Sequence, residues 1–571
     1  MINKKIIPRS VNMQLRHDPA RFFTAISFIP GLIVFLCFLL RVLAELRSGQ
    51  WEPDLDYLMY MADQWLSGRP PWIYEFDDKL PISNIFFLPS ALAGSICIYQ
   101  LQTTLMIMAG GAASAYVFIN QAKSIRDLPK FIIYAVGLFT GAIFCYSLAF
   151  TASSINTINS VSASLFMIAS SLLFFSFSAN RDRNRIRMLS LPTLISSLVF
   201  SIAVSIRPYY ILASILIMAW VYLTAKTKFL LSLFQACLIW TLLILGSGLI
   251  INVLPYLASG NSQALIAGLS ILSQKLIPST LQEMVKRQFF DIISLPDLLF
   301  LAFTSSVLLL LVLFLSPKFL PHFLRFQDFK PADLSKLRAN ALFVGVFLTA
   351  SVELVILRKH YYPHYLQLFI PFTSLSIAFL LTAIAPALKN INIVTRPKLA
   401  IYSILLLLAV LRTDFAYAVN DSLHPILDSR TAEYATFSQD PDMAERLKKG
   451  FLYPESMSLH WKMHSRRFGM PNSYSFKLIS DGAWQAINMP AYFKLPTTPD
   501  SLCQKLLESG APTIITKTDS IASCLDNDPK RTFRQLTPID HSLIDLATKA
   551  QKSSPYRIRV YERVNGAASK T

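Results

Sequence analysis

Long apolar runs separated by short polar segments occupy the chain from Phe22 to about Val419. A helix needs about 20 mostly apolar residues to cross a bilayer core. We therefore predict eleven membrane-spanning helices, at 22–44, 98–120, 131–150, 156–179, 189–206, 208–224, 229–254, 298–316, 340–357, 362–385 and 399–419. The pattern changes after this point, and residues 420–571 have the mixed composition of a soluble domain.

Two further apolar segments are not counted as spans. Residues 82–97 are short and contain Pro89, so they are better explained as an interfacial helix. Residues 270–293 form an amphipathic pattern, which fits either a gate lying on the membrane surface or a plain connector.

Composition and charge agree with a membrane protein. Of 571 residues, 53% are hydrophobic and 15% are charged, and the net charge is +19. The basic residues form short clusters between the apolar runs, which marks cytoplasmic loops and argues against nucleic-acid binding. The clusters are Lys4 to Arg21, Lys123 to Lys130, Arg181 to Arg187, Lys226 with Lys228, Lys318 to Arg338, and Lys389 to Lys398. With residues 1–21 inside, eleven crossings place residues 45–97 and 420–571 outside.

The C-terminal segment, 420–571, predicts a small extracytoplasmic α/β or α+β domain. SLCQKLLESG is typical of a helix ending at Gly510, and APTIITKT and PYRIRVYERV are typical of strands. Cys503 and Cys524 both fall in this domain, and whether they pair is left open.

The first outer loop carries candidate chemistry. Asp54 follows the first span closely and therefore lies near the membrane surface. A carboxylate held there can act as a general base that takes the proton of an attacking acceptor. The alternative is that the acidic residues of this loop are ordinary solvated carboxylates.

The same loop resembles that of the C-type glycosyltransferase superfamily, especially the branch of protein O-mannosyltransferases and the lipid A aminoarabinose transferase. Asp54 stands at the position of the family aspartate, followed by Tyr57, Ala62 and Gly68 at the expected spacing. Lys79-Leu80-Pro81-Ile82 stands where that family has Lys-Pro-Pro-Leu. Leu55 replaces the second acid common in the family, and Asp56 lies one place further on, so Asp56 competes with Asp54 for the role of base.

The resemblance continues along the chain. Arg207-Pro208 is similar to the basic residue and proline at the outer end of the fifth span in related enzymes. LRKHYYPHYLQLFIPF, residues 357–372, resembles a His-Tyr segment of bacterial members. The resemblance implies a polyprenyl-phosphate sugar as donor, with basic residues holding its phosphate; these are Lys79, Arg207, Arg358, Lys359, His360 and His364. The candidate pocket residues are Tyr57, Tyr209, Tyr210 and Tyr365. For the basic and aromatic residues at helix ends, interfacial anchoring is the alternative.

We therefore expect an inverting glycosyltransferase of the bacterial inner membrane. Its acceptor would be lipid A, lipopolysaccharide, another envelope glycan or a protein, and its other partners membrane lipids. A transporter of lipid-linked glycans and an inactive scaffold are the alternatives. No cofactor is expected. The loop between the third and fourth spans, residues 149–160, has Asn156 and Asn159 but no carboxylate, which weakens the case for a divalent metal.

Overall fold

The computed structural model describes the helical part of the chain most completely. It covers residues 19–48, 55–123, 130–150, 155–178, 187–224, 232–276, 367–375, 440–454, 498–536 and 559–564, with gaps at 69, 73–78, 94, 209 and 517. Scattered positions between 404 and 423 are also described.

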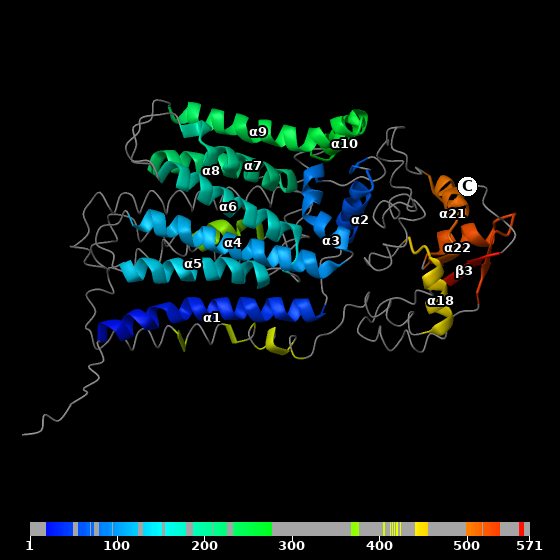
Figure 1. Ribbon diagram of the computed structural model, residues 1–571, viewed down its shortest axis with the longest axis horizontal. Coiled ribbons are helices and arrows are strands. Elements are labelled where there is room, and N and C mark those ends of the chain that lie inside the picture. Colours follow the sequence, from blue (N-terminus) through cyan, green and yellow to red (C-terminus); the bar gives the residue numbers. More distant parts are fainter. Residues whose placement is uncertain are drawn as a thin grey trace, which may run out of the picture.

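Seven apolar helices form a bundle (Figure 1). They are α1 (Pro19–Ser48), α4 (Ile96–Ala122), α5 (Lys130–Phe150), α6 (Ile158–Ser178), α7 (Leu191–Ile206), α8 (Tyr210–Thr224) and α9 (Leu233–Ala258). They match the first seven predicted spans in order. The short connections and the alternating direction of the helices bring their ends together at two opposite faces of the bundle. Lys123 and Lys130 lie at one of these faces, where α4 ends and α5 begins.

Five of these helices, α1, α4, α5, α6 and α9, are long and apolar enough to cross a membrane. The helices α7 and α8 have 16 and 15 residues, so each is about 24 Å long or less, short of a bilayer core of about 30 Å. Several apolar helices thus indicate a membrane-embedded protein. The predicted spans 298–316 and 340–357 lie outside the described residues, and 362–385 and 399–419 are described only in part. The total of eleven stays a prediction.

Small residues let the bundle helices approach closely. A Cβ on Gly111 of α4 would lie 2.8 Å from the carbonyl oxygen of Gly141 of α5, and one on Gly141 would lie 2.7 Å from that of Gly111. Between α6 and α7, Ser196 donates to the Ala169 carbonyl at 2.7 Å. Packing of small residues and interhelical hydrogen bonds replace the hydrophobic driving force that lipid does not supply.

The chain between α1 and α4 forms three short helices at one end of the bundle, which we call the loop end. They are α2 (Leu55–Leu66), the 3₁₀ helix η1 (Pro81–Phe87) and α3 (Leu88–Ala93). Residues 82–97 therefore do not form a span, as predicted. However, η1 is not a surface helix: Ile82, Ser83 and Asn84 are buried. The reason is that η1 packs against the ends of α7 and α9.

After α9, the chain turns at Gly260, whose φ of +69° favours glycine, and α10 (Ser262–Leu276) begins. It packs on Trp72, which is fully buried. A Cβ on Gly268 of α10 would lie 2.1 Å from the Trp72 ring. Tyr256, near the end of α9, donates its hydroxyl to the Pro71 carbonyl. The candidate amphipathic segment 270–293 is thus helical as far as Leu276, and the rest lies outside the described residues.

The C-terminal elements include α18 (Pro441–Lys449), α21 (Pro499–Glu508), β1 (Thr513–Thr516), α22 (Asp519–Asp526), β2 (Phe533–Gln535) and β3 (Arg559–Arg563). The strands form an antiparallel sheet in the order β1-β3-β2, with Ile514 opposite Tyr561. The predicted helix and both predicted strands are confirmed as α21, β1 and β3. The three described strands pair antiparallel, as in an α+β arrangement, and Leu452 adds a parallel bridge to Ile514.

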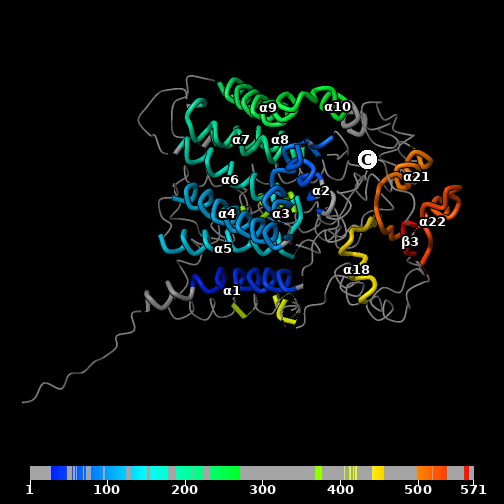
Figure 2. The backbone as a smooth tube through the Cα atoms, turned by 45° about the vertical axis from the view of Figure 1, so that its right-hand side comes forward, coloured from blue at the N-terminus to red at the C-terminus, as the bar shows by residue number. Residues whose placement is uncertain are grey.

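Two further observations concern this domain, one on its internal cross-link and one on its position. Cys503 of α21 and Cys524 of α22 form a disulfide with Cα atoms 5.8 Å apart, which answers the question that the sequence left open. Figures 1 and 2 both show α18, α21, α22 and β3 beyond the loop end of the bundle, on the side of α2 and α3. The first loop and the C-terminal domain therefore lie on the same side.

Candidate functional site

Two buried basic residues, Lys79 and Arg207, come together at the loop end, where they are only 5% and 7% exposed. The backbone N–H of Leu80 donates to the carbonyl of Ser205 at 3.2 Å, so the two basic residues flank a direct contact between the first loop and the end of α7. Ionisable groups buried at the ends of apolar helices usually have a function, and positive charge there is suited to an anionic ligand.

Arg207 is fixed from two directions. Its backbone leaves the helix in an extended conformation, while its N–H still donates to the Ala203 carbonyl at 2.9 Å. Its guanidinium Nε donates to the side-chain oxygen of Asn159 at 2.5 Å. Asn159 lies in the first turn of α6 and is fully buried. The orientation of this arginine therefore depends on where α6 begins.

The first loop is attached to the bundle through Asn252 of α9. The N–H of Ile82 donates to the Asn252 side-chain oxygen at 3.0 Å, and the Asn252 amide donates to Ser205 Oγ at 3.0 Å. Asn252 is 5% exposed. One asparagine thus connects η1, α7 and α9 beside Arg207.

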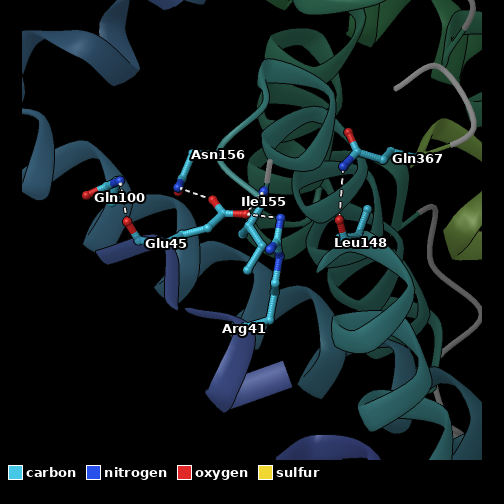
Figure 3. Close-up of polar contacts among 7 residues, drawn as sticks. All are labelled: Arg41, Glu45, Gln100, Leu148, Ile155, Asn156 and Gln367. Atoms are coloured by element: carbon cyan, nitrogen blue, oxygen red, sulfur yellow. Dashed lines mark hydrogen bonds and ion pairs between the residues drawn. The ribbon is translucent and has the colours of Figure 1, made fainter. Parts of the chain in front are cut away.

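A second polar centre surrounds Glu45, near the end of α1 (Figure 3). Arg41 lies 3.2 Å from Glu45 Oε1, and their side chains are only 4% and 2% exposed. Glu45 Oε1 accepts from the Ile155 N–H at 2.7 Å, and Oε2 accepts from the Asn156 amide at 2.8 Å. Since Asn156 precedes α6, this carboxylate fixes the chain segment that leads to Asn159.

Residues 367–375 lie beside the same segment. Thr157 donates its hydroxyl to the Gln367 side-chain oxygen. The Gln367 amide donates to the Leu148 carbonyl at 2.9 Å (Figure 3). Tyr210, 3% exposed, donates its hydroxyl to the Leu368 carbonyl at 3.0 Å. The structure therefore brings together the Arg207 region and the end of the His-Tyr segment, which are far apart in the sequence.

The sequence-predicted residues divide into three groups. Lys79, Arg207 and Tyr210 are brought to the loop end, although the hydroxyl of Tyr210 is bonded to the protein backbone. Asp56 and Tyr57 lie in the first turn of α2, which begins at Leu55. The remaining candidates lie outside the described residues, and they are Asp54, Tyr209, Arg358, Lys359, His360, His364 and Tyr365.

Sequence reasoning missed Arg41, Glu45, Asn252 and Gln367. For Arg41 and Glu45 a signal was present, because they are an oppositely charged pair four residues apart at the end of an apolar span, and ionisable groups there usually have a function. Asn252 and Gln367 gave no comparable signal, since a single amide near a span end is common.

The chemistry that the described residues favour is anion binding. They contain no group of three His, Cys, Asp or Glu side chains arranged to hold a metal ion. The absence of a carboxylate from residues 149–160 is offset by the fold, because Glu45 brings one to Ile155 and Asn156 from α1. Both of its oxygens accept hydrogen bonds from the protein, so its role is to position that segment.

Comparisons with known proteins add no assignment: no protein-family model matches the chain, and no curated protein matches it.

Proposed function

We propose that this protein is an inverting glycosyltransferase that moves a sugar from a polyprenyl-phosphate donor to an acceptor at the loop end of the bundle. The observation that carries the proposal is the pair of buried basic residues, Lys79 and Arg207, at the end of an apolar helical bundle. A lipid-linked phosphate fits this position, because its chain lies among apolar helices and its charge lies at their ends.

The two basic residues are suited to different parts of this task. Arginine holds phosphate through two parallel N–H bonds, whereas lysine acts as a point charge. The bond from Arg207 Nε to Asn159 fixes the plane of the guanidinium, which is the group whose direction matters for phosphate binding. Positive charge at this place stabilises the phosphate as it leaves the sugar.

The transfer is a single displacement. The acceptor oxygen or nitrogen attacks C1 of the sugar while the C1–O bond to the phosphate breaks. The electron pair of that bond remains on the polyprenyl phosphate, and the acceptor proton passes to a carboxylate. Asp54 is the proposed base, and Asp56, one residue into α2, is the competitor.

The proposed orientation places the loop end and the C-terminal domain outside a bacterial inner membrane. Support comes from the disulfide between Cys503 and Cys524, since disulfides persist in oxidising compartments. It also comes from Lys123 and Lys130, which lie at the opposite face, where positive charge is retained inside. The acceptor is then lipid A, lipopolysaccharide, another envelope glycan or a protein.

The test is donor turnover by the full-length protein in lipid nanodiscs, supplied with a panel of polyprenyl-phosphate sugars. Asp54→Asn is expected to lower kcat at least 100-fold without changing donor affinity, because general-base catalysis contributes about that factor or more. Arg207→Ala is expected to weaken donor binding as well as turnover.

Arg47→Ala is the matched control, because Arg47 lies in the last turn of α1 at the same face but is exposed. It should leave binding and turnover at the wild-type level. If wild-type protein binds the donors but never cleaves them, the protein is a transporter or scaffold. If Arg207→Ala binds donor like wild type, the phosphate site is wrong.

A further inference from the structure

Two polar side chains of η1, Ser83 and Asn84, are completely buried, with an exposed fraction of 0%. Within the described part of the chain, neither Ser83 Oγ nor Asn84 Oδ1 has a hydrogen-bond partner. The amide nitrogen of Asn84 is bonded, to the Pro81 carbonyl at 3.2 Å, so the side chain is held in place with its oxygen unused.

These two oxygens without hydrogen-bond partners lower the stability of the folded protein. A buried oxygen without a partner costs about 1–3 kcal/mol, because its hydrogen bonds to water are lost and not replaced. An apolar residue of similar size would avoid that cost. Two adjacent groups of this kind, fixed in one short helix, are therefore better explained by a ligand than by stability.

The position of η1 indicates which part of a ligand would reach it. Ser83 and Asn84 follow Lys79 by four and five residues. The N–H groups of Leu80 and Ile82 are bonded to Ser205 and Asn252, so this stretch is fixed beside Arg207. A group attached to a phosphate that lies between Lys79 and Arg207 is consequently adjacent to η1.

We propose that Ser83 and Asn84 form a subsite for the hydroxyl groups of the donor sugar. Asn84 Oδ1 accepts a hydrogen bond from one sugar hydroxyl, and Ser83 Oγ donates to or accepts from a neighbouring one. This inference rests on the proposed function, since it names the sugar-binding part of the same site. Both side chains are fully buried in this structure, so the donor reaches them only when neighbouring residues move.

The first arm of the test measures stability and needs no donor. Ser83→Ala removes an oxygen without a partner, so the protein in nanodiscs should unfold at the same temperature as wild type or a higher one. Ser90→Ala is the control: Ser90 of α3 is also buried, but its Oγ donates to the Ser95 carbonyl, so this variant should unfold earlier. A lower unfolding temperature for Ser83→Ala would show that Ser83 has a structural role and would overturn the proposal.

The second arm compares two ligands, a polyprenyl-phosphate sugar and the same polyprenyl phosphate without sugar. Ser83→Ala and Asn84→Ala should each raise KM for the sugar donor about tenfold, which corresponds to one lost hydrogen bond. Their affinity for the sugar-free lipid should stay at the wild-type value. Ser90→Ala should change neither, and Arg207→Ala should weaken both.

The two proposals fail in different ways. If wild-type protein turns over a donor and Ser83→Ala and Asn84→Ala match it in KM, the sugar subsite is wrong and the glycosyltransferase stands. The subsite is equally wrong if these variants weaken binding of the sugar-free lipid as much as binding of the donor. If wild-type protein binds neither lipid, the proposed function fails, and the subsite fails with it.

Discussion

At the scale of single residues, Glu45 shows how a charge is held among apolar helices. Its carboxylate is 2% exposed and receives Arg41, the Ile155 N–H and the Asn156 amide. A buried ion pair contributes little net stability by itself, but removal of one partner leaves the other charge uncompensated. The pair therefore fixes the start of α6 more than it stabilises the whole protein, and through Asn159 it sets the position of Arg207.

Glu45→Gln is expected to destabilise the protein by about 3 kcal/mol, because Arg41 stays buried after its counter-charge is removed. The glutamine also loses one acceptor, so the Asn156 amide is left without its bond. Thermal unfolding in nanodiscs, followed by tryptophan fluorescence, measures the effect.

The double variant Arg41→Met/Glu45→Gln removes both charges and should regain most of the lost stability. If the double variant unfolds as early as Glu45→Gln alone, the uncompensated Arg41 charge is not the cause of the destabilisation. The ion pair then does not hold the segment before α6 in place.

At the scale of elements, the short helices at the loop end are held to the bundle by a few specific contacts. Asn252 attaches η1 to α7 and α9. Trp72 lies under α10, which covers the loop from the other direction. Close approach of α10 requires the absence of a side chain at position 268, so the glycine there is a packing requirement.

Gly268→Ala places a methyl group 2.1 Å from the Trp72 ring, closer than any real contact, so α10 must move away from the loop. The expected cost is about 1–3 kcal/mol, the usual range for overpacking. Gly246→Ala in α9 is the control, because nothing lies within 4 Å of its Cβ position, and alanine is the better helix former.

Both variants are compared by thermal unfolding and by the rate of tryptic cleavage in the first loop. If Gly268→Ala and Gly246→Ala have the same unfolding temperature and the same cleavage rate, α10 does not pack against Trp72 as described.

At the scale of the whole molecule, the arrangement is a helical bundle with its first loop and its C-terminal domain on one side (Figures 1 and 2). The C-terminal domain is small, and its disulfide closes a loop of 21 residues between α21 and α22. A cross-link of that span is worth about 3 kcal/mol in the chain-entropy model. If the domain lies outside the membrane, as proposed, oxidising conditions there help to keep it folded.

Cysteine labelling tests this orientation. In a chain whose unpaired Cys37, Cys97, Cys145 and Cys237 are replaced, Ser520→Cys, at an exposed position of α22, should react with a membrane-impermeant maleimide in intact spheroplasts. Lys123→Cys, at the opposite face of the bundle, should react only after lysis. The parent chain should react only after reduction of the disulfide. Labelling of Lys123→Cys in intact spheroplasts and protection of Ser520→Cys would reverse the orientation.

The sequence alone determined the elements, because apolar runs of about 20 residues and clustered basic residues are local signals. It predicted the seven apolar helices of the bundle in order, the absence of a span at 82–97, and α21, β1 and β3 of the C-terminal domain. The interfacial position predicted for 82–97 was wrong, because most of η1 is buried. It also selected Lys79 and Arg207 as phosphate ligands by resemblance, with the assignment of that role still a proposal.

Only the tertiary structure decided which distant residues share a place. Glu45 supplies the carboxylate beside Asn156 that residues 149–160 lack, Asn252 attaches η1, and Gln367 lies beside Thr157. The pattern of apolar and polar residues shows which side of a helix is buried, but it does not show which neighbouring helix covers that side. The roles of the Glu45 carboxylate, the Asn252 amide and the unused oxygens of Ser83 and Asn84 depend on residues tens or hundreds of positions away. Only the packed bundle brings those residues together.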